Sequence, residues 1–441
     1  MEEDRKSRLW GANRRVFLRH GAVSTVGTGA TFLAACGTVE TPKTDSPSNA
    51  APYKLTFGNG FAAGERLEWA QKATAEFSRI NGPQLTAEHA VITGDPLFAA
   101  MAGGSGPDVT QTSGSWFSDF ADKGQLQDIT SYVKRDKVDM SRWYMQDETF
   151  IRKGKQYGMP YWQAHAVYLY NKTLFAKHGV RPPDNENWTW TDMLNAAVKL
   201  TTPGESFGIQ MGFGFEFSWL NFLRSAGEDY VNKERTKTPV NTPGAIEVFQ
   251  WLVDLVQRHK VHPGPTDTTS LGAGNWWNLG KIGMRLSGTG ILGATLTAKP
   301  DFEWDMFVTP KSPKTGKRVI TANENPMVVT SSTKQPEAGY KLVSFFADKY
   351  SQDMVGKYRI NMPSLKGSAA DTTGWLSPPP ADMKLSLEQM KHAGTLSFHL
   401  NWLQWYNETQ KVLTTAFAGE SSVKEACDKA AQMGDTLLKG V

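Results

Sequence analysis

The residues of this chain that could do chemistry are its carboxylates and its tryptophans. Hydrolysis of a glycosidic bond needs two carboxyl groups about 5 to 10 Å apart, and Glu216 with Glu324 is only a nominal pair, because sequence does not fix their separation. The sequence contains no H-E-x-x-H motif, no P-loop and no Cys/His cluster for a metal. We therefore expect no catalytic residue, no metal and no cofactor, and keep a surface-anchored glycoside hydrolase as the enzyme alternative.

The chain contains 15 tryptophans. Their flat apolar faces match the axial C–H face of a pyranose ring, so they favour a sugar as the ligand. One such stacking contact contributes roughly 0.5–1.5 kcal/mol beyond area burial, whereas micromolar affinity needs about 8 kcal/mol. A sugar site would therefore need two or three aromatic platforms together with oriented hydrogen bonds.

The elements that must position such residues follow an α/β pattern. Tyr53–Phe57 predicts a strand that ends at Gly58-Asn59-Gly60, and Glu65–Ile80 is amphipathic at the helical period. A second strand starts at Val109 and runs into Ser113–Trp116. Because ligands in open α/β sheets lie beyond the carboxyl ends of the strands, we expect Asn59 and Ser113 to share one cleft.

A longer strand is predicted at Met159–Tyr170, which has no turn signal inside and is long enough to cross between two lobes. Helices are predicted at Trp190–Leu200, started by Thr189 or Thr191, and at Thr242–Lys260, with Pro243 in the first turn. The segments Gly208–Gly227 and Asn275–Gly293 combine glycines with aromatic residues. Such glycines let a backbone approach a flat ligand closely.

The first 37 residues predict export. Asn13–Arg19 (NRRVFLR) is typical of a twin-arginine leader, Gly21–Ala35 is a short, weakly apolar segment, and Leu33–Gly37 (LAACG) is typical of a lipobox. The apolar segment falls short of the roughly 20 residues of a transmembrane helix. We expect cleavage before Cys36, its lipidation, and a protein held on the outer face of the cell membrane by several acyl chains.

The sequence after the leader indicates a mature protein that is almost neutral and has no disulfide bond. Thr38–Pro52 lacks apolar periodicity and is expected to be a tether. Six of the 48 Lys and Arg and three of the 44 Asp and Glu lie in residues 1–35, so the remainder is almost neutral. This disfavours a nucleic-acid partner. Of the two cysteines, Cys36 would be lipidated and Cys427 lies among apolar residues at helical spacing, as expected of a buried, inert thiol.

The chain resembles the extracellular solute-binding proteins of ABC importers, in particular the carbohydrate-binding family that includes the maltose- and multiple-sugar-binding proteins. The segments that carry the resemblance span nearly the whole chain after the tether: Gly106–Val109, Gly124–Ile129, Tyr157–Tyr161, Leu169–Phe175, Gly179-Val180, Pro182-Pro183, Trp190–Leu194, Gly280–Met284, Ser331–Ala338 and Gly419–Ala426.

The resemblance implies an α/β fold of the periplasmic-binding-protein type II kind, with two lobes, a hinge and an interlobe cleft that closes on its ligand. We expect crossings at Tyr161–Val167 and Thr321–Met327, with a return after Pro363. Lobe 1 would comprise 53–162 plus 323–367, and lobe 2 would comprise 163–322 plus 368–441, after the leader (1–35) and the lipidated tether (36–52). The implied partners are a sugar or oligosaccharide and the permease subunits of an ABC transporter, and the chain is expected to be a monomer.

The candidate ligand contacts come from cleft loops, crossing strands and segments where the family places aromatics, with Trp219 as the leading candidate. Trp402 and Trp405 stand at i and i+3 on one helical face, and one of Trp276 and Trp277 is expected in the core. His165 is expected to be a hydrogen-bonded packing residue, and Trp190 a packing residue at a helix start. The full set is Asn59, Ser113, Trp116, Trp162, Gln163, Trp219, Trp276, Trp277, Gly288, Thr289, Asn323, Glu324, Arg359, Trp402 and Trp405.

Two further interpretations stay open at this stage. A sugar-sensing lipoprotein that docks on a membrane receptor would use the same cleft. The scarcity of acidic residues among the cleft candidates, Glu216 and Glu324 being the two, disfavours a cationic ligand such as a polyamine.

Overall fold

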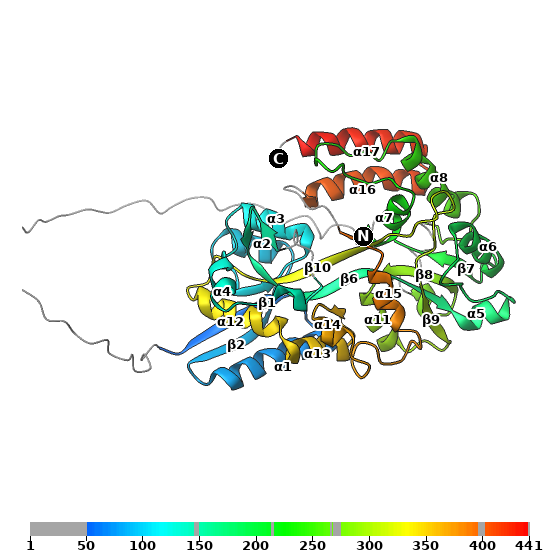
Figure 1. Ribbon diagram of the computed structural model, residues 1–441. Coiled ribbons are helices and arrows are strands. Elements are labelled where there is room, and N and C mark those ends of the chain that lie inside the picture. The colour runs from blue at the N-terminus through cyan, green and yellow to red at the C-terminus, as the bar shows by residue number, and fades with distance from the viewer. Residues whose placement is uncertain are drawn as a thin grey trace, which may run out of the picture. The chain divides into compact units, whose positions relative to one another are not determined.

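A computed structural model describes residues 51–144, 150–212, 216–264, 267, 275–395 and 402–439 (Figure 1). These residues belong to one compact unit, Ala50–Val441. The predicted leader, Cys36 and almost all of the predicted tether lie outside the described residues. Among the helices that are described, none is long and apolar enough to span a bilayer.

A single large mixed sheet organises this unit. Its strand order is β2-β1-β3-β10-β6-β8-β7, with β9 and β11 paired to β6 and β12 paired to β10. A separate hairpin pairs β4 with β5. The strands are β1 Tyr53–Asn59, β2 Leu85–Val91, β3 Val109–Gln111, β4 Ile151–Arg152, β5 Lys155–Gln156, β6 Gly158–Asn171, β7 Phe207–Gln210, β8 Ile282–Gly288, β9 Trp304–Phe307, β10 Ile320–Val329, β11 Met362–Pro363 and β12 Ala393–Thr395.

Two long strands connect the halves of the sheet, as the predicted strand at 159–170 requires. β6 and β10 run antiparallel and side by side, with Ala322 opposite His165 and Val328 opposite Gly158 (Figure 1). β10 continues the sheet toward β3, whereas β6 continues it toward β8 and β9. The predicted crossings therefore fall where these two strands pair, and the exact lobe boundaries stay a prediction.

Helices cover the sheet, and several begin where side chains cap them. Thr189 forms a capping box with Asp192 at the start of α6, which settles the choice between Thr189 and Thr191. Thr242 caps α8, and Pro243 occupies its first position. The helices are α1 Gly64–Asn81, α2 Asp95–Ala102, α3 Gly114–Asp122, α4 Thr130–Arg135, α5 Lys172–Lys177, α6 Trp190–Leu200, α7 Glu216–Ser225, α8 Pro243–Gln257, α10 Asn275–Asn278, α11 Gly290–Ala298, α12 Pro336–Ala347, α13 Lys349–Lys357, α14 Lys366–Ala369, α15 Lys384–Met390, α16 Trp402–Ala418 and α17 Val423–Leu438, with a 3-10 turn at Met140–Arg142.

The buried hydrophobic residues form separate clusters on the two halves of the sheet. One gathers Phe57, Trp69 and Phe346 around β1 and α1, and another gathers Phe222, Phe249 and other residues of α6, α7, α8, α16 and α17. Cys427 lies in the second cluster, where burial raises the pKa of its thiol to about 12. This agrees with the expected buried, unreactive thiol.

Candidate functional site

The pairing of β6 with β10 sets opposite faces for neighbouring side chains, because successive residues of a strand point to opposite sides of a sheet. Gln163 lies opposite Glu324, and the next pair is Ala164 opposite Asn323. Gln163 and Glu324 therefore share one face, while Asn323 belongs to the other. The candidate polar residues of the crossing are thus divided between two environments.

The carboxyl group of Glu324 is completely buried and holds three segments together. Its Oε1 accepts hydrogen bonds from Tyr161 N at 3.0 Å and from Ser364 Oγ at 2.5 Å, and its Oε2 accepts one from Gln163 Nε2. Gln163 Nε2 also donates to Tyr144 O at 2.6 Å. Burial raises the pKa of Glu324 well above its usual value.

The structure therefore leaves Glu324 no free oxygen for a ligand, whereas Gln163 keeps one atom, its fully buried Oε1, without a hydrogen bond in the described chain. Both side chains are fully buried, and the carboxylate oxygens of Glu324 are engaged by protein donors from β6 and from the residue after β11. The group ties together the three predicted crossings between the lobes. Its position is where the predicted hinge would lie.

The opposite face presents polar atoms without protein partners. Asn323 is only 6% exposed, and its Oδ1 has no hydrogen bond within the described chain. Asn59, at the end of β1, is 4% exposed. Its Oδ1 accepts a hydrogen bond from Phe61 N at 2.9 Å and lies 2.8 Å from His89 Nε2. Its Nδ2 has no partner in the described residues. Buried polar groups without partners are rare and costly, so these two amides are the candidates that the structure supports best.

Trp162 is held among protein groups. Its ring stacks on Tyr161 with centroids 4.2 Å apart, lies 5.7 Å from Phe61, and is 3% exposed. The guanidinium of Arg66 lies 5.6 Å from the same ring. The structure gives no support to the expected stacking of a ligand on Trp162, because protein groups surround its ring, and that stacking stays a prediction. Sequence reasoning missed Arg66, whose position in the first turn of α1 was the available signal.

Residues of α11 and of the turn before β11 also meet near the crossing. Thr289 is fully buried, donates its hydroxyl to Asn361 Oδ1, and its backbone N donates to His165 O at 3.0 Å. Gly288 ends β8 opposite Ala166. Thr289 thus packs structurally, which corrects its prediction as a free ligand contact.

Arg359 is buried at 6% exposure and has a positive φ of 53°. Its Nη2 donates to the carbonyl and hydroxyl oxygens of Ser377, and its guanidinium lies 5.9 Å from the Trp375 ring. Burial lowers its pKa to about 10, so it stays charged at neutral pH. Its Nη1 has no hydrogen-bond partner in the described chain.

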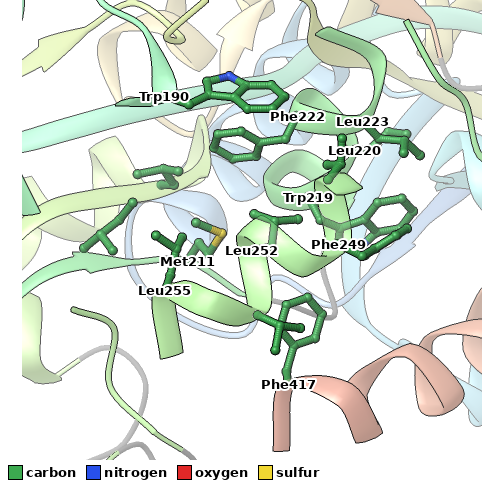
Figure 2. Packing of buried hydrophobic residues seen from close by; sticks show 14 of the residues in the cluster. Trp190, Met211, Trp219, Leu220, Phe222, Leu223, Phe249, Leu252, Leu255 and Phe417 are labelled. Atoms are coloured by element: carbon green, nitrogen blue, oxygen red, sulfur yellow. The ribbon is translucent and has the colours of Figure 1, made fainter. Parts of the chain in front are cut away.

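Several predicted stacking residues are core residues instead, and Figure 2 shows one of them, Trp219, near Phe249. Trp219 is 2% exposed, lies 5.6 Å from the Phe249 ring, and donates its Nε1 to Gln410 Oε1 at 3.2 Å. Trp277 and Trp405 are each 1% exposed, and their Nε1 atoms donate to Thr295 Oγ1 and Thr238 Oγ1. Trp276 packs against Phe207 at 5.0 Å. The structure therefore shows these four tryptophans as packing residues and not as platforms for a ligand. The sequence predicted that one of Trp276 and Trp277 is in the core, and both are.

Two of the remaining candidates, Trp116 and Ser113, lie at the start of α3, whereas the side chain of Trp402 is not described. Trp116 is half-buried against Phe98, with ring centroids 5.0 Å apart, and is compatible with a ligand contact or with packing. Ser113 is the residue before α3, and its hydroxyl does not cap that helix. The side chains of Trp402 and Glu216 lie outside the described residues.

Two histidines differ from what the sequence indicated. His165 is fully buried as expected, but neither ring nitrogen has a hydrogen bond in the described chain, and burial lowers its pKa to about 3. His262 was not singled out by sequence reasoning. Its Nε2 accepts from Met211 N at 3.0 Å and its Nδ1 lies 2.7 Å from Pro263 O, an arrangement that suits the neutral ring, whose pKa burial lowers to about 4.

One hydrolase-like pattern was also missed: Gly204–Gly208 reads G-x-S-x-G. In a hydrolase this motif places an exposed serine between a strand and a helix. Here Ser206 is 5% exposed, donates its hydroxyl to Leu200 O at 2.9 Å, and directly precedes β7. The match is therefore structural. Among the described residues, no group of three or more His, Cys, Asp or Glu could hold a metal ion.

Comparison with known proteins decides the family. The model of the bacterial extracellular solute-binding proteins matches residues 63–353, more than half of the chain. The chain belongs to this family. A curated relative, the diacetylchitobiose binding protein of Streptomyces coelicolor, is 24% identical over 294 residues, which cover 62% of this chain and 66% of the relative.

Solved structures show the same fold over almost their whole length. An ABC substrate-binding protein from Listeria monocytogenes in complex with cycloalternan gives a TM-score of 0.79 at 24% identity and covers 88% of this chain and 98% of that chain. Maltose-bound MalE3 from T. maritima gives a TM-score of 0.75 at 20% identity, covering 87% and 99%. The predicted α/β fold with two lobes and a hinge is thereby confirmed.

Proposed function

We propose that this solute-binding protein captures a sugar or oligosaccharide between its lobes and delivers it to the permease of an ABC importer. The observation that carries the proposal is full-length structural similarity to proteins solved with cycloalternan and with maltose. Two buried amide atoms without partners in the described chain, Asn59 Nδ2 and Asn323 Oδ1, give this chain its own polar groups for hydroxyl recognition. Closure of the lobes, with no chemistry on the ligand, is the proposed mechanism.

The binding half of the proposal is tested by titrating the purified chain with mono- and oligosaccharides in a calorimeter, followed by mass spectrometry of the recovered sugar. We expect saturable binding and an unchanged sugar. A cleaved sugar would revive the glycoside hydrolase alternative. A panel without any binder would contradict sugar recognition.

We further propose export through the twin-arginine pathway and lipid anchoring at Cys36 on the outer face of the cell membrane, based on the leader sequence. Replacing Arg14 and Arg15 with Lys should block export, and Cys36→Ser should abolish labelling by radioactive palmitate. Cys427→Ser is the matched control, because Cys427 is buried and should carry no lipid.

Delivery to a permease is distinguished from sugar sensing by uptake. Deletion of the chain should abolish uptake of the bound sugar, and the Cys36→Ser form should restore less of it than the parent. Normal uptake after deletion, with a lost transcriptional response to the sugar, would favour the sensing lipoprotein.

A further inference from the structure

At the corner between β1 and α1, the guanidinium of an arginine is exposed, whereas the aromatic rings beside it are buried. Arg66 is exposed, and its Cζ lies 5.7 Å from the ring centroid of Phe61 and 5.6 Å from that of Trp162. The two rings are themselves only 6% and 3% exposed. A ligand that reaches this corner therefore meets the charge of Arg66 before it meets either ring.

This charge has no counter-ion within the described part of the chain, where Arg66 makes no ion pair and no hydrogen bond, and its guanidinium lies near the two rings and near Gly290. The adjacent carboxylate, Glu65, accepts a hydrogen bond from Thr297 Oγ1 at 3.1 Å. Rings bind a guanidinium through its face, which leaves the N–H groups at its edge able to donate. Such a fork matches the paired oxygens of a carboxylate, sulfate or phosphate.

A second donor without a partner stands at the last residue of β1, before the loop that leads to α1. Asn59 Nδ2 is buried and unpaired in the described residues, whereas the oxygen of the same amide is already bonded to Phe61 N. The first turn of α1 adds further donors, because its N-cap residue Ala63 supplies no side-chain cap. The corner is therefore rich in donors.

The second half of the molecule approaches the same guanidinium. A Cβ added at Gly290, the first residue of α11, would lie 3.5 Å from Arg66 Nη2. The residue before it, Thr289, also gives α11 no side-chain cap. A ligand group at Arg66 would thus touch both halves, which is where a charge contributes most to closure, since it is partly removed from water there.

We propose that the sugar bound by this protein carries an anionic substituent, a carboxylate, sulfate or phosphate ester, which is recognised by Arg66 and Asn59. This inference rests on the proposed sugar-binding function and narrows its ligand class. A neutral hydroxyl could accept the same hydrogen bonds but would leave the charge of Arg66 without a counter-ion.

Calorimetric titration of the purified protein with matched pairs tests the inference: glucose against glucuronate, N-acetylglucosamine against its 6-sulfate, and glucose against its 6-phosphate, together with oligosaccharides of the same units. We expect the anionic member of at least one pair to bind about tenfold tighter or more, with the difference shrinking at high ionic strength. The three pairs separate the three anionic groups.

Variants separate the role of Arg66 from general electrostatics. Arg66→Gln should abolish the preference for the anionic member, and Arg66→Lys should retain part of it, because Lys keeps the charge but loses the fork. Arg79→Gln is the matched control, since Arg79 is an exposed arginine in the last turn of the same helix, paired with Glu76. It should leave every affinity unchanged.

The outcomes distinguish this inference from the function on which it rests. Neutral sugars that bind as tightly as their anionic partners, or an anionic preference that survives Arg66→Gln, would overturn the inference and leave sugar binding standing. Equal weakening of both members by Arg66→Gln would also overturn it. A failure of every sugar to bind would contradict the proposed function itself.

Discussion

Glu324 and Asn323 are neighbours on β10, yet their oxygens meet opposite environments. Both oxygens of Glu324 accept hydrogen bonds, from Tyr161, Ser364 and Gln163, whereas Oδ1 of Asn323 accepts none in the described chain. Both residues are buried. The comparison separates a polar group that the fold uses from one that the fold leaves available.

This difference is informative because buried polar groups are almost always satisfied. A carboxyl group whose two oxygens both accept hydrogen bonds, such as that of Glu324, stabilises the arrangement of the strands that meet there. An unsatisfied amide at the same crossing costs stability unless something else pairs with it, and a sugar hydroxyl is suited to do so. The two faces of the crossing therefore predict different consequences of mutation.

The largest expected effect is at the saturated group. Glu324→Ala would leave Tyr161 N and Ser364 Oγ without their acceptor and would remove one of the two acceptors of Gln163 Nε2. At about 1–3 kcal/mol for each unsatisfied donor, we expect a loss of about 3–5 kcal/mol in the free energy of unfolding. Chemical denaturation measures this loss. Glu324→Gln, which keeps the shape and one acceptor, is the control and should lose less. If Glu324→Ala unfolds like the parent, the assignment of Glu324 to hinge structure is wrong.

Trp219 extends the comparison to aromatic residues. Because its ring is buried against Phe249 and its Nε1 is bonded to Gln410, Trp219→Ala should cost about 3–5 kcal/mol of stability. Trp116→Ala, at a half-buried position, should cost less. Thermal and chemical denaturation of the two variants test this. A stable Trp219→Ala protein that has lost ligand affinity would restore Trp219 to the binding site.

His262 is expected to make a contribution to stability that depends on pH. Its folded pKa of about 4 lies below the usual 6.5, so protonation favours the unfolded state. Its contribution to stability is present above pH 6.5 and is lost as pH falls toward 4. At about 1.4 kcal/mol per pKa unit, the loss is about 3 kcal/mol.

Denaturation curves at several pH values check this contribution. His262→Gln should flatten the fall in stability between pH 6.5 and 4. An unchanged slope in His262→Gln would show that the neutral ring does not contribute as described.

The smallest expected change in stability is at the unsatisfied amide. Asn323→Ala removes an oxygen that bonds to nothing in the described chain, so stability should change by less than about 1 kcal/mol. Affinity for the sugar should fall about tenfold, which corresponds to about 1.4 kcal/mol. Calorimetric titration measures the affinity. Unchanged affinity would remove Asn323 from the site.

The sequence predicted the scaffold well because its signals are local. The crossing strand at 159–170, a helix started by Thr189 or Thr191, and Pro243 in the first turn of α8 all follow from periodicity and capping. The structure contains all three, with Thr189 as the helix start. Buried Cys427 was also predicted from helical spacing. These features depend on neighbours within one or two turns of the chain.

The site was predicted less well because exposure depends on contacts far along the chain. Trp219 is buried by α8 and α16, about 30 and 190 residues away, and no local pattern separates it from Trp116. Glu324 is satisfied by residues from two other segments, whereas Asn323 next to it is not. Arg66 was overlooked because its position in the first turn of α1 is a weak signal, and its proximity to Trp162 depends on the packing of β6 beside α1.

The measurement that tests the central claim most directly is calorimetric titration of the purified chain with neutral and anionic oligosaccharides, followed by mass spectrometry of the recovered ligand. The account predicts saturable binding of an intact sugar, weakened by Asn323→Ala in a protein that remains folded. Absence of binding across the panel, or release of a cleaved sugar, would contradict it.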